Sequence, residues 1–204
     1  MTTARRALLA VALLLAGCVT VAPPVADQDA AGVKWRQHYA EVAAITHFNL
    51  LGRAASGGGV GVKADLRWRQ QDDGRFDVRL SGPFGAGAIS ISGTEREVEI
   101  RTKDGVTTTS DPEAWLQQQA GWTFPVRGLR WWARGLPSPD SPAQPLFDAD
   151  GRLVTLVQDG WTFRYTEYQD VQGIALPRRF EAASERITLK LIVDRWEDLP
   201  AARS

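Results

Sequence analysis

Apolar and polar residues alternate along most of this chain. In residues 60–68 every second side chain is apolar, from Val60 to Trp68, and Gly, Lys, Asp and Arg stand between them. A period of two is typical of a strand that buries one face and exposes the other. Comparable runs occupy residues 48–55, 76–80, 98–100, 153–158, 161–165, 176–180 and 187–196. Turn signals such as Asp73-Gly74 separate them, so the pattern predicts about eleven strands joined mostly by antiparallel hairpins.

Three segments have a helical period instead. In residues 33–45 the large apolar side chains recur every three or four positions and share one face: Trp35, Tyr39, Val42 and Ile45. A second helix is predicted to start with Ser110 or Asp111 as its N-cap and to stop near Gly121. A third is indicated by Leu129 and Trp132 and ends at Gly135 and Pro137. Residues 138–145 hold three prolines and are expected to form an extended crossing loop.

Strands that follow one another, with a few helices inserted, predict a mainly β (α+β) fold. The expected architecture is a strongly curved antiparallel sheet or incomplete β-barrel, with helices over its open side. Helices packed tightly on the sheet would produce a closed core. Helices packed loosely would instead leave an apolar groove suited to an acyl chain. The alternation alone favours the closed core, because an apolar strand face is usually a packing face.

The first residues form a separate unit. Arg5 and Arg6 precede an apolar stretch, residues 7–15, that is far shorter than the ~20 residues needed to cross a bilayer, so a signal peptide is predicted. Leu15-Ala16-Gly17-Cys18 follows the pattern of a bacterial lipobox. Cys18 is the only cysteine and has no disulfide partner. We therefore expect a cleaved signal peptide (residues 1–17), a lipidated Cys18 with a flexible tether (18–32), and one domain (33–204).

Composition narrows the chemistry further. Basic and acidic residues balance at 24 each, and no basic block is present, so nucleic acid is not an expected partner. No Gly-x-Ser-x-Gly or His-Glu-x-x-His motif occurs, and the only two histidines, His38 and His47, are predicted to be surface or capping residues. We expect no enzyme activity, no metal and no cofactor. Two alternatives remain: an accessory envelope lipoprotein with a closed core, and a lipid-anchored hydrolase with paired acids in one cleft.

Several motifs spread over nearly the whole mature chain resemble the LolB family of outer-membrane lipoprotein receptors. They are the lipobox, the early helix with Trp35, Phe48-x-Leu50-x-Gly52-Arg53, Phe76-x-Val78-x-Leu80, Gly82-Pro83-Phe84-Gly85, Pro125-Val126-x-x-Leu129-x-x-Trp132-x-x-Gly135-Leu136-Pro137, Leu176-Pro177-x-x-Phe180 and Ile187-x-Leu189-Lys190-Leu191. The Trp-x-x-Gly-Leu-Pro segment is the most specific of these. The Gly57-Gly58-Gly59 loop and a Phe at position 84, where the family commonly has Leu, are departures.

This resemblance implies a function. It implies an incomplete barrel of the LolA/LolB type whose apolar cavity takes the acyl chains of other lipoproteins. The cargo would arrive from the periplasmic carrier LolA and leave into the outer membrane. Val19 after the cysteine, in place of Asp, fits sorting of this chain to the outer membrane, where it would be lipid-anchored on the periplasmic face. A monomer is expected.

The resemblance also nominates site residues. The family places an exposed apolar side chain at Phe84, so Pro83, Phe84 and Gly85 are expected to form a membrane-insertion loop. Strand phase alone nominates the acyl-chain cavity: Trp68, Phe76, Leu80, Ile89, Ile91, Ile100 and Phe163.

Overall fold

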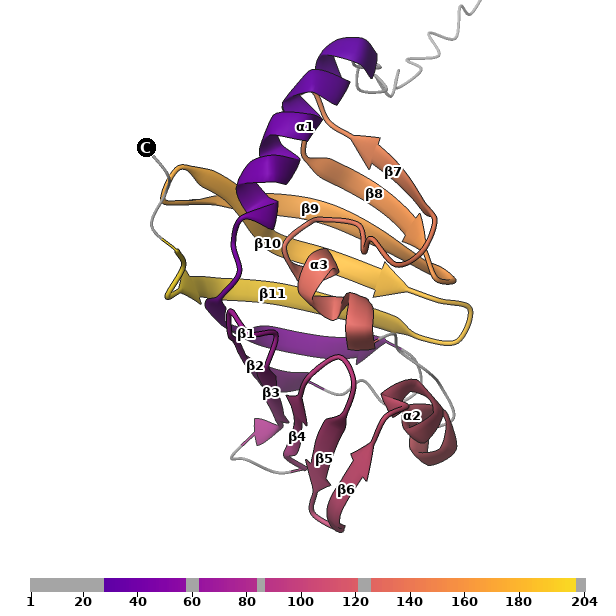
Figure 1. Ribbon diagram of the computed structural model, residues 1–204. Helices are drawn as coiled ribbons and strands as arrows, with labels where there is room; N and C mark the ends of the chain where they lie inside the picture. Colours follow the sequence, from indigo (N-terminus) through magenta and orange to yellow (C-terminus); the bar gives the residue numbers. More distant parts are fainter. Residues whose placement is uncertain (1–27, 58–62, 84–86, 121–125, 201–204) are drawn as a thin grey trace, which may run out of the picture.

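The computed structural model describes residues 28–57, 63–83, 87–120 and 126–200 (Figure 1). The strands in this part number eleven, as the alternation predicts. They are β1 (Phe48–Gly57), β2 (Lys63–Gln70), β3 (Phe76–Ser81), β4 (Ile89–Gly93), β5 (Val98–Thr102), β6 (Gly105–Thr109), β7 (Ala143–Phe147), β8 (Leu153–Gln158), β9 (Trp161–Val171), β10 (Ile174–Ala183) and β11 (Thr188–Glu197). The helices are α1 (Gln28–Ala43), α2 (Pro112–Ala120) and α3 (Leu129–Ala133), the last preceded by a 3-10 turn (Val126–Gly128).

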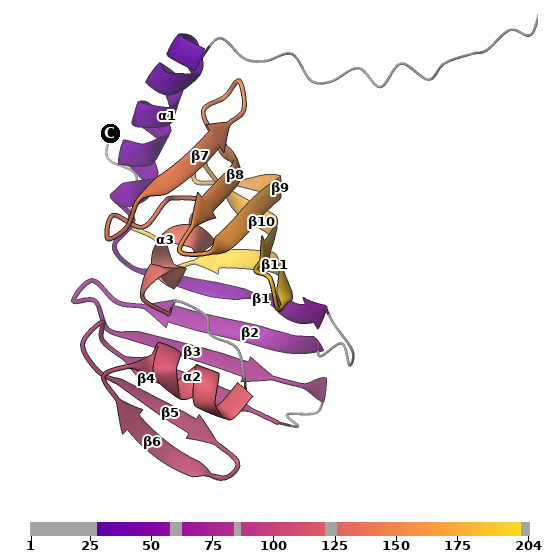
Figure 2. The same cartoon turned by 90° about the vertical axis from the view of Figure 1, so that its right-hand side faces the viewer.

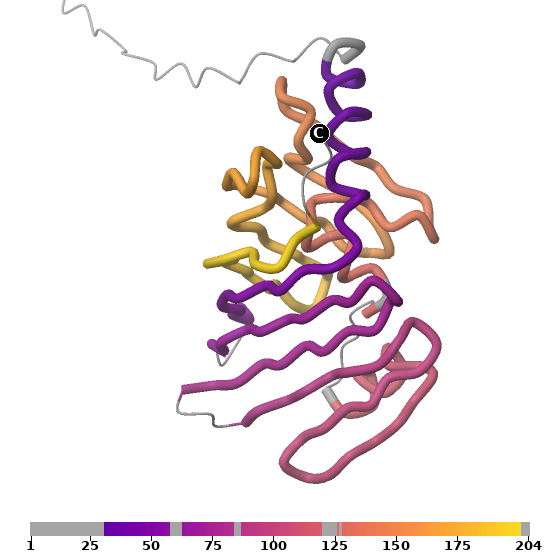
Figure 3. The backbone as a smooth tube through the Cα atoms, turned by 60° about the vertical axis from the view of Figure 1, so that its left-hand side comes forward, coloured from indigo at the N-terminus to yellow at the C-terminus, as the bar shows by residue number. Residues whose placement is uncertain are grey.

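All eleven strands belong to one antiparallel sheet that does not close. The strand order is β6-β5-β4-β3-β2-β1-β11-β10-β9-β8-β7, so the first and last strands lie side by side at the centre. Every other neighbouring pair is consecutive in sequence, which is the meander that short turns produce. Figure 3 shows the two halves of the sheet extending from the central β1–β11 pair. Strands β6 and β7 are its two free edges, so the barrel is incomplete, as predicted.

The two faces of the sheet differ as the alternation requires. In β2, Leu66 and Trp68 are buried while Lys63, Arg67 and Arg69 are exposed. The register aligns one apolar row across five strands: Leu50, Trp68, Val78, Ile91 and Ile100. We call the side that carries this row the inner face. Helix α3 and the turn before it lie over this face, because Leu129 of α3 and Val126 of the turn line one small cavity together with Trp68 and Val78.

Helix α1 starts at Gln28, ahead of the predicted start at Val33, so residues 28–32 are helical and do not belong to a flexible tether. Its apolar stripe is confirmed, since Val42 and Ile45 are buried and Trp35 stacks on Phe147 with 4.3 Å between ring centroids. The surface location expected for His38 is wrong. This side chain is 7 % exposed and lies edge-on to Tyr168.

Buried hydrogen bonds fix α3 against α1 and the sheet. Arg134, only 4 % exposed, donates to the carbonyl oxygens of Val42 in the last turn of α1 (3.1 Å) and of Ile45 just after the helix (2.5 Å). Burial, with Arg130 nearby, lowers the pKa of its guanidinium to about 10. Trp132 donates its indole N–H to Gln158 Oε1 at 2.8 Å. The Trp-x-x-Gly-Leu-Pro segment therefore has a structural role: its buried hydrogen bonds hold α3 against α1 and the sheet.

The chain turns sharply after α3. Gly135 has a φ of +77°, and a Cβ there would lie 3.1 Å from both Pro177 Cγ and Tyr168 Oη. Residues 138–145 end in a strand and not only in the extended loop expected, because Ala143–Phe147 pairs with β8. No helix in the described part of the chain is both long and apolar enough to cross a membrane.

Candidate functional site

A cavity of about 520 Å³ lies between α2 and the inner face of β4, β5 and β6. Figure 2 shows α2 in front of these strands, apart from α3. Its apolar wall includes Ile89 and Ile100 from the sheet and Trp115 and Leu116 from the helix. The β5–β6 hairpin, residues 102–107, forms its polar rim. This volume lies within the range of small-ligand sites, and the lining suits an apolar ligand with a polar group at its end.

The sequence around α2 explains why the helix lies there. Asp111 caps the helix by accepting the Ala114 N–H at 2.9 Å, and Pro112 occupies the first turn, where a missing N–H costs nothing. Glu113 accepts the Val126 N–H at 2.9 Å, which ties the start of α2 to the turn before α3. Trp115 and Leu116, both half-buried, then point to the cavity.

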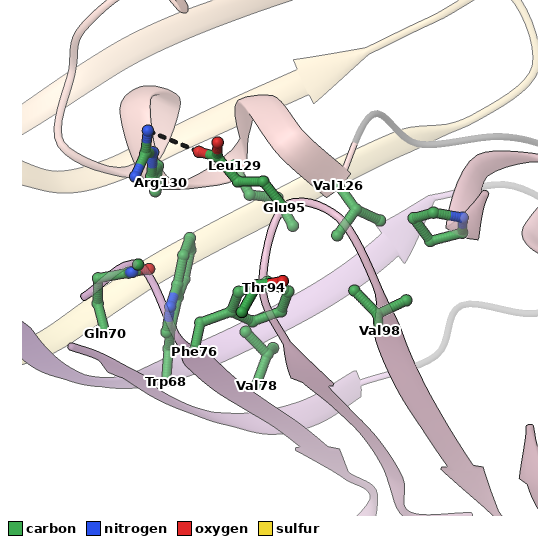
Figure 4. Close-up of a pocket in the computed structure, with 12 residues that line it drawn as sticks. Trp68, Gln70, Phe76, Val78, Thr94, Glu95, Val98, Val126, Leu129 and Arg130 are labelled. Carbon is green, nitrogen blue, oxygen red and sulfur yellow. Dashed lines mark ion pairs between the residues drawn. The ribbon is translucent and has the colours of Figure 1, made fainter. Parts of the chain in front are cut away.

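A second, nearly filled cavity of about 20 Å³ lies closer to the centre of the sheet (Figure 4). Trp68, Phe76 and Val78 contribute its sheet wall, and Val126 and Leu129 cover it. Its volume holds little more than one water molecule. Arg130 on α3 and Glu95 in the β4–β5 turn form an ion pair of 2.6 Å beside it, drawn as a dashed line in Figure 4. The inner face is therefore closed here and open beneath α2.

The structure divides the nominated cavity residues between these two places. Trp68 and Phe76 line the small cavity, and Ile89 and Ile100 line the large one. Leu80 and Ile91 share the inner face, where Leu80 pairs with Ile89 and Ile91 with Ile100.

Phe163 has a different environment. It is 1 % exposed and packs on Trp132, with ring centroids 4.6 Å apart, in the core beneath β8–β10. Neither of the two cavities has Phe163 in its lining. Its phase along β9 places it on the inner face, but the covering residues fill the space above it.

Neither strand alternation nor the family resemblance nominates Trp115 and Leu116, because both lie on a helix outside the quoted motifs. The available signal was the predicted helix from residue 110 to 121, in which these two large side chains are adjacent and followed one turn later by Gln119. Of the insertion loop, Pro83 is exposed, whereas Phe84 and Gly85 lie outside the described residues, as does Cys18.

An open antiparallel half-barrel with a partly covered apolar inner face defines the structural class of this chain, and solved structures share its architecture. A LolA superfamily protein from Nitrosomonas europaea superposes with a TM-score of 0.54 at 11% identity, over 81% of this chain and 94% of that chain. A DUF1329 family protein from Desulfovibrio piger superposes with a TM-score of 0.53 at 8% identity, over 88% of this chain and 94% of that chain. At such low identities these likenesses establish the architecture.

The sequence comparisons are more specific. The family described as "Outer membrane lipoprotein LolB" matches residues 46–196. The outer-membrane lipoprotein LolB of Stutzerimonas stutzeri is 35% identical over 192 residues, which cover 91% of this chain and 91% of that protein. Its counterpart in Pseudomonas aeruginosa is 36% identical over 193 residues, covering 90% and 91%. The chain belongs to the LolB family of outer membrane lipoproteins.

Proposed function

We propose that this chain receives lipoproteins from a LolA-like periplasmic carrier, holds their acyl chains under α2, and inserts them into the outer membrane. The observation that carries the proposal is the cavity of about 520 Å³ with Ile89, Ile100, Trp115 and Leu116 in its wall. A closed-core accessory lipoprotein needs no such space. The role is binding and transfer, so the chain is not an enzyme and works without a cofactor. A single copy holds the whole site, so we propose a monomer.

The energetics explain why such a site is needed. Burying one CH₂ group is worth about 0.8 kcal/mol, so a long acyl chain left in water would cost on the order of 10 kcal/mol. Handing the chain from one apolar cavity to another avoids that exposure. A membrane offers more apolar contact than a partly covered cavity, so release into the bilayer is favourable without a nucleotide at this step.

The anchor is a separate part of the proposal. Lipid on Cys18 would hold the chain on the periplasmic face of the outer membrane. The segment from Cys18 to Gln28, where α1 begins, would reach roughly 30 Å if fully extended. That length keeps the domain near its membrane and still leaves it free to turn toward a carrier.

Insertion is assigned to the loop with Pro83, Phe84 and Gly85. One Phe side chain contributes about 2–3 kcal/mol at most on burial, which is too little for attachment and enough to disturb a headgroup layer locally. Phe84→Glu should therefore bind cargo normally but fail to release it into bilayers. Transfer of a labelled lipoprotein from carrier to liposomes measures this, with Phe84→Leu as the active control. Normal release by Phe84→Glu would contradict the assigned role.

The binding function itself is tested with the mature chain carrying Cys18→Ala, which lacks the acylated residue. A fluorescent fatty acid should bind it saturably, and an unlabelled lipopeptide should displace the probe. The same protein should take an acylated lipoprotein from the carrier. Absence of saturable binding together with absence of transfer would overturn the proposal in favour of the closed-core alternative.

A further inference from the structure

The two free edges of the sheet are not equivalent. β7 contains Pro145, which removes one backbone donor from that edge. β6, Gly105-Val106-Thr107-Thr108-Thr109, contains neither a proline nor a charged residue. Among the described residues it pairs only with β5. Edge strands usually carry charges or prolines that prevent further pairing, so β6 is unusually open to an added strand.

The register shows which backbone groups of β6 are available. Thr102 and Gly105 are paired across the two-residue turn, so this pair, Ile100 with Thr107, and Val98 with Thr109 exchange the hydrogen bonds between β5 and β6. The alternate residues, Val106 and Thr108, direct their N–H and C=O groups away from β5. Two donors and two acceptors therefore point outward from this edge.

The same edge borders the large cavity. Gly105, Val106 and Thr107 belong to its rim, and Val106 is 49% exposed. Figure 2 shows the other strands on one side of β6 and no described element beyond it. The outward backbone groups of β6 are therefore close to the opening of the cavity.

The covalent structure of a lipoprotein indicates which polypeptide segment would lie beside β6. In a lipoprotein the acylated cysteine is the first residue of the mature chain, so its acyl chains continue directly into an N-terminal segment. The segment after Cys18 in this chain begins Val19-Thr20-Val21-Ala22, which is uncharged and rich in β-branched residues. Such a segment favours the extended conformation that strand addition needs.

We propose that β6 binds the segment following the lipidated cysteine of the cargo as an added strand, through the backbone of Val106 and Thr108. The inference rests on the proposed function and deepens it. Acyl chains in the cavity supply most of the affinity, and main-chain hydrogen bonds orient the polypeptide. Backbone groups are the same in every sequence, so this mode accepts cargo of many sequences.

Synthetic lipopeptides test the proposal from the side of the cargo. Each carries a diacylglyceryl cysteine followed by six uncharged residues, and is titrated against the mature chain carrying Cys18→Ala. One version has an unmodified backbone, and two others are N-methylated at odd or at even positions. Because donors alternate along a strand, one N-methylated version should bind about tenfold more weakly and the other should bind nearly normally. Equal affinities for all three would overturn the proposal.

Protein variants test the same contact from the other side. Thr108→Pro removes an outward N–H without removing a β5–β6 bond, whereas Thr108→Ala keeps that N–H. We expect Thr108→Pro to weaken lipopeptide binding several-fold and to leave binding of a plain fatty acid unchanged, and Thr108→Ala to match the parent. Equal losses for lipopeptide and fatty acid would mean that the cavity itself was damaged, and the N-methylated lipopeptides, which leave the protein unchanged, then decide. If Thr108→Pro weakens neither kind of binding, the proposal is wrong.

The outcomes separate this inference from the function on which it rests. Saturable fatty-acid and lipopeptide binding without any effect of N-methylation keeps the carrier function and removes the β6 contact. Failure of the parent protein to bind either ligand removes both.

Discussion

At the scale of single residues, buried polar groups hold the cover of the sheet in place. Arg134 has carbonyl oxygens as its partners, and Gln158 joins Trp132 to Ser138. A buried donor or acceptor that loses its partner costs about 1–3 kcal/mol, so these contacts specify one position for α3.

His38 makes the stability of the domain depend on pH. Burial lowers its pKa below the ordinary value of 6.5, although Glu41 acts in the opposite direction. The unfolded chain then binds a proton more readily than the folded one, so this contribution is complete above pH 6.5 and decreases as the pH falls below it. Urea unfolding should show lower stability at pH 5.5 than at pH 7.5, and less of this loss in His38→Gln. An unchanged loss in the variant would contradict the assignment.

Gly135 is predicted to be intolerant of a side chain. Its positive φ and the 3.1 Å approach of a Cβ to Pro177 and Tyr168 act together, so Gly135→Ala should lower the free energy of unfolding by about 2–4 kcal/mol. Gly173→Ala is the matched control, because Gly173 also has a positive φ (+85°) but nothing within 4 Å of the added Cβ. Denaturant unfolding should show a smaller loss there. Equal losses would rule out a steric contribution.

At the scale of elements, α2 and α3 differ in how they are attached to the rest of the fold. α3 is held in place by buried hydrogen bonds and covers the inner face near the centre of the sheet, where little space is left. α2 is capped by Asp111 and tied through Glu113, and its Trp115 and Leu116 border open space. The fold therefore combines a closed centre under α3 with an open region under α2 that offers an apolar ligand a place to bind.

Because α2 borders the open cavity, we expect its side chains to contact a bound acyl chain. Trp115→Ala should weaken fatty-acid binding roughly tenfold, because a large apolar side chain contributes on the order of 1–3 kcal/mol of contact. Gln117→Ala is the control, since Gln117 is exposed on the same helix and outside the cavity lining. Fluorescent probe titration measures both, and circular dichroism checks the fold. Unchanged affinity in Trp115→Ala would place the ligand elsewhere.

At the scale of the whole molecule, the ends of the domain sequence meet in the middle of the sheet. β1 and β11 are neighbours, so each half of the half-barrel is a local meander and the two edges stay far apart in the strand order. This arrangement leaves the sheet open, and the proposed lipid attachment residue, Cys18, is separate in the sequence from the cavity-forming strands. Anchor and cavity are then expected to function independently.

Cys18→Ala tests that independence. The mature variant should bind acylated cargo with the affinity of the parent protein, because the cavity residues all lie beyond α1. It should, however, deliver cargo to inner and outer membrane vesicles alike, since nothing holds it at one membrane. Fractionation of a labelled lipoprotein after transfer measures the distribution. Loss of binding in this variant would show that the anchor contributes to the cavity.

Much of the fold could be predicted from the sequence. The two periods, the turn signals and the lipobox are local patterns, and they determined the strands, the helices, the two-faced sheet and the family resemblance. Alternation places Trp68, Ile100 and Phe163 on the inner face because successive side chains of a strand point to opposite sides. It cannot say how much space lies above each of them.

Only the tertiary structure decided how much space lies above each inner-face residue. Trp68 lies under α3 beside a cavity that is almost filled, Ile100 borders open space under α2, and Phe163 is packed against Trp132. The packing of distant segments also buries His38 and places β6 at the rim of the cavity. The physical reason is that a residue's face depends on its neighbours in sequence, whereas its depth depends on segments distant in the chain that pack over it.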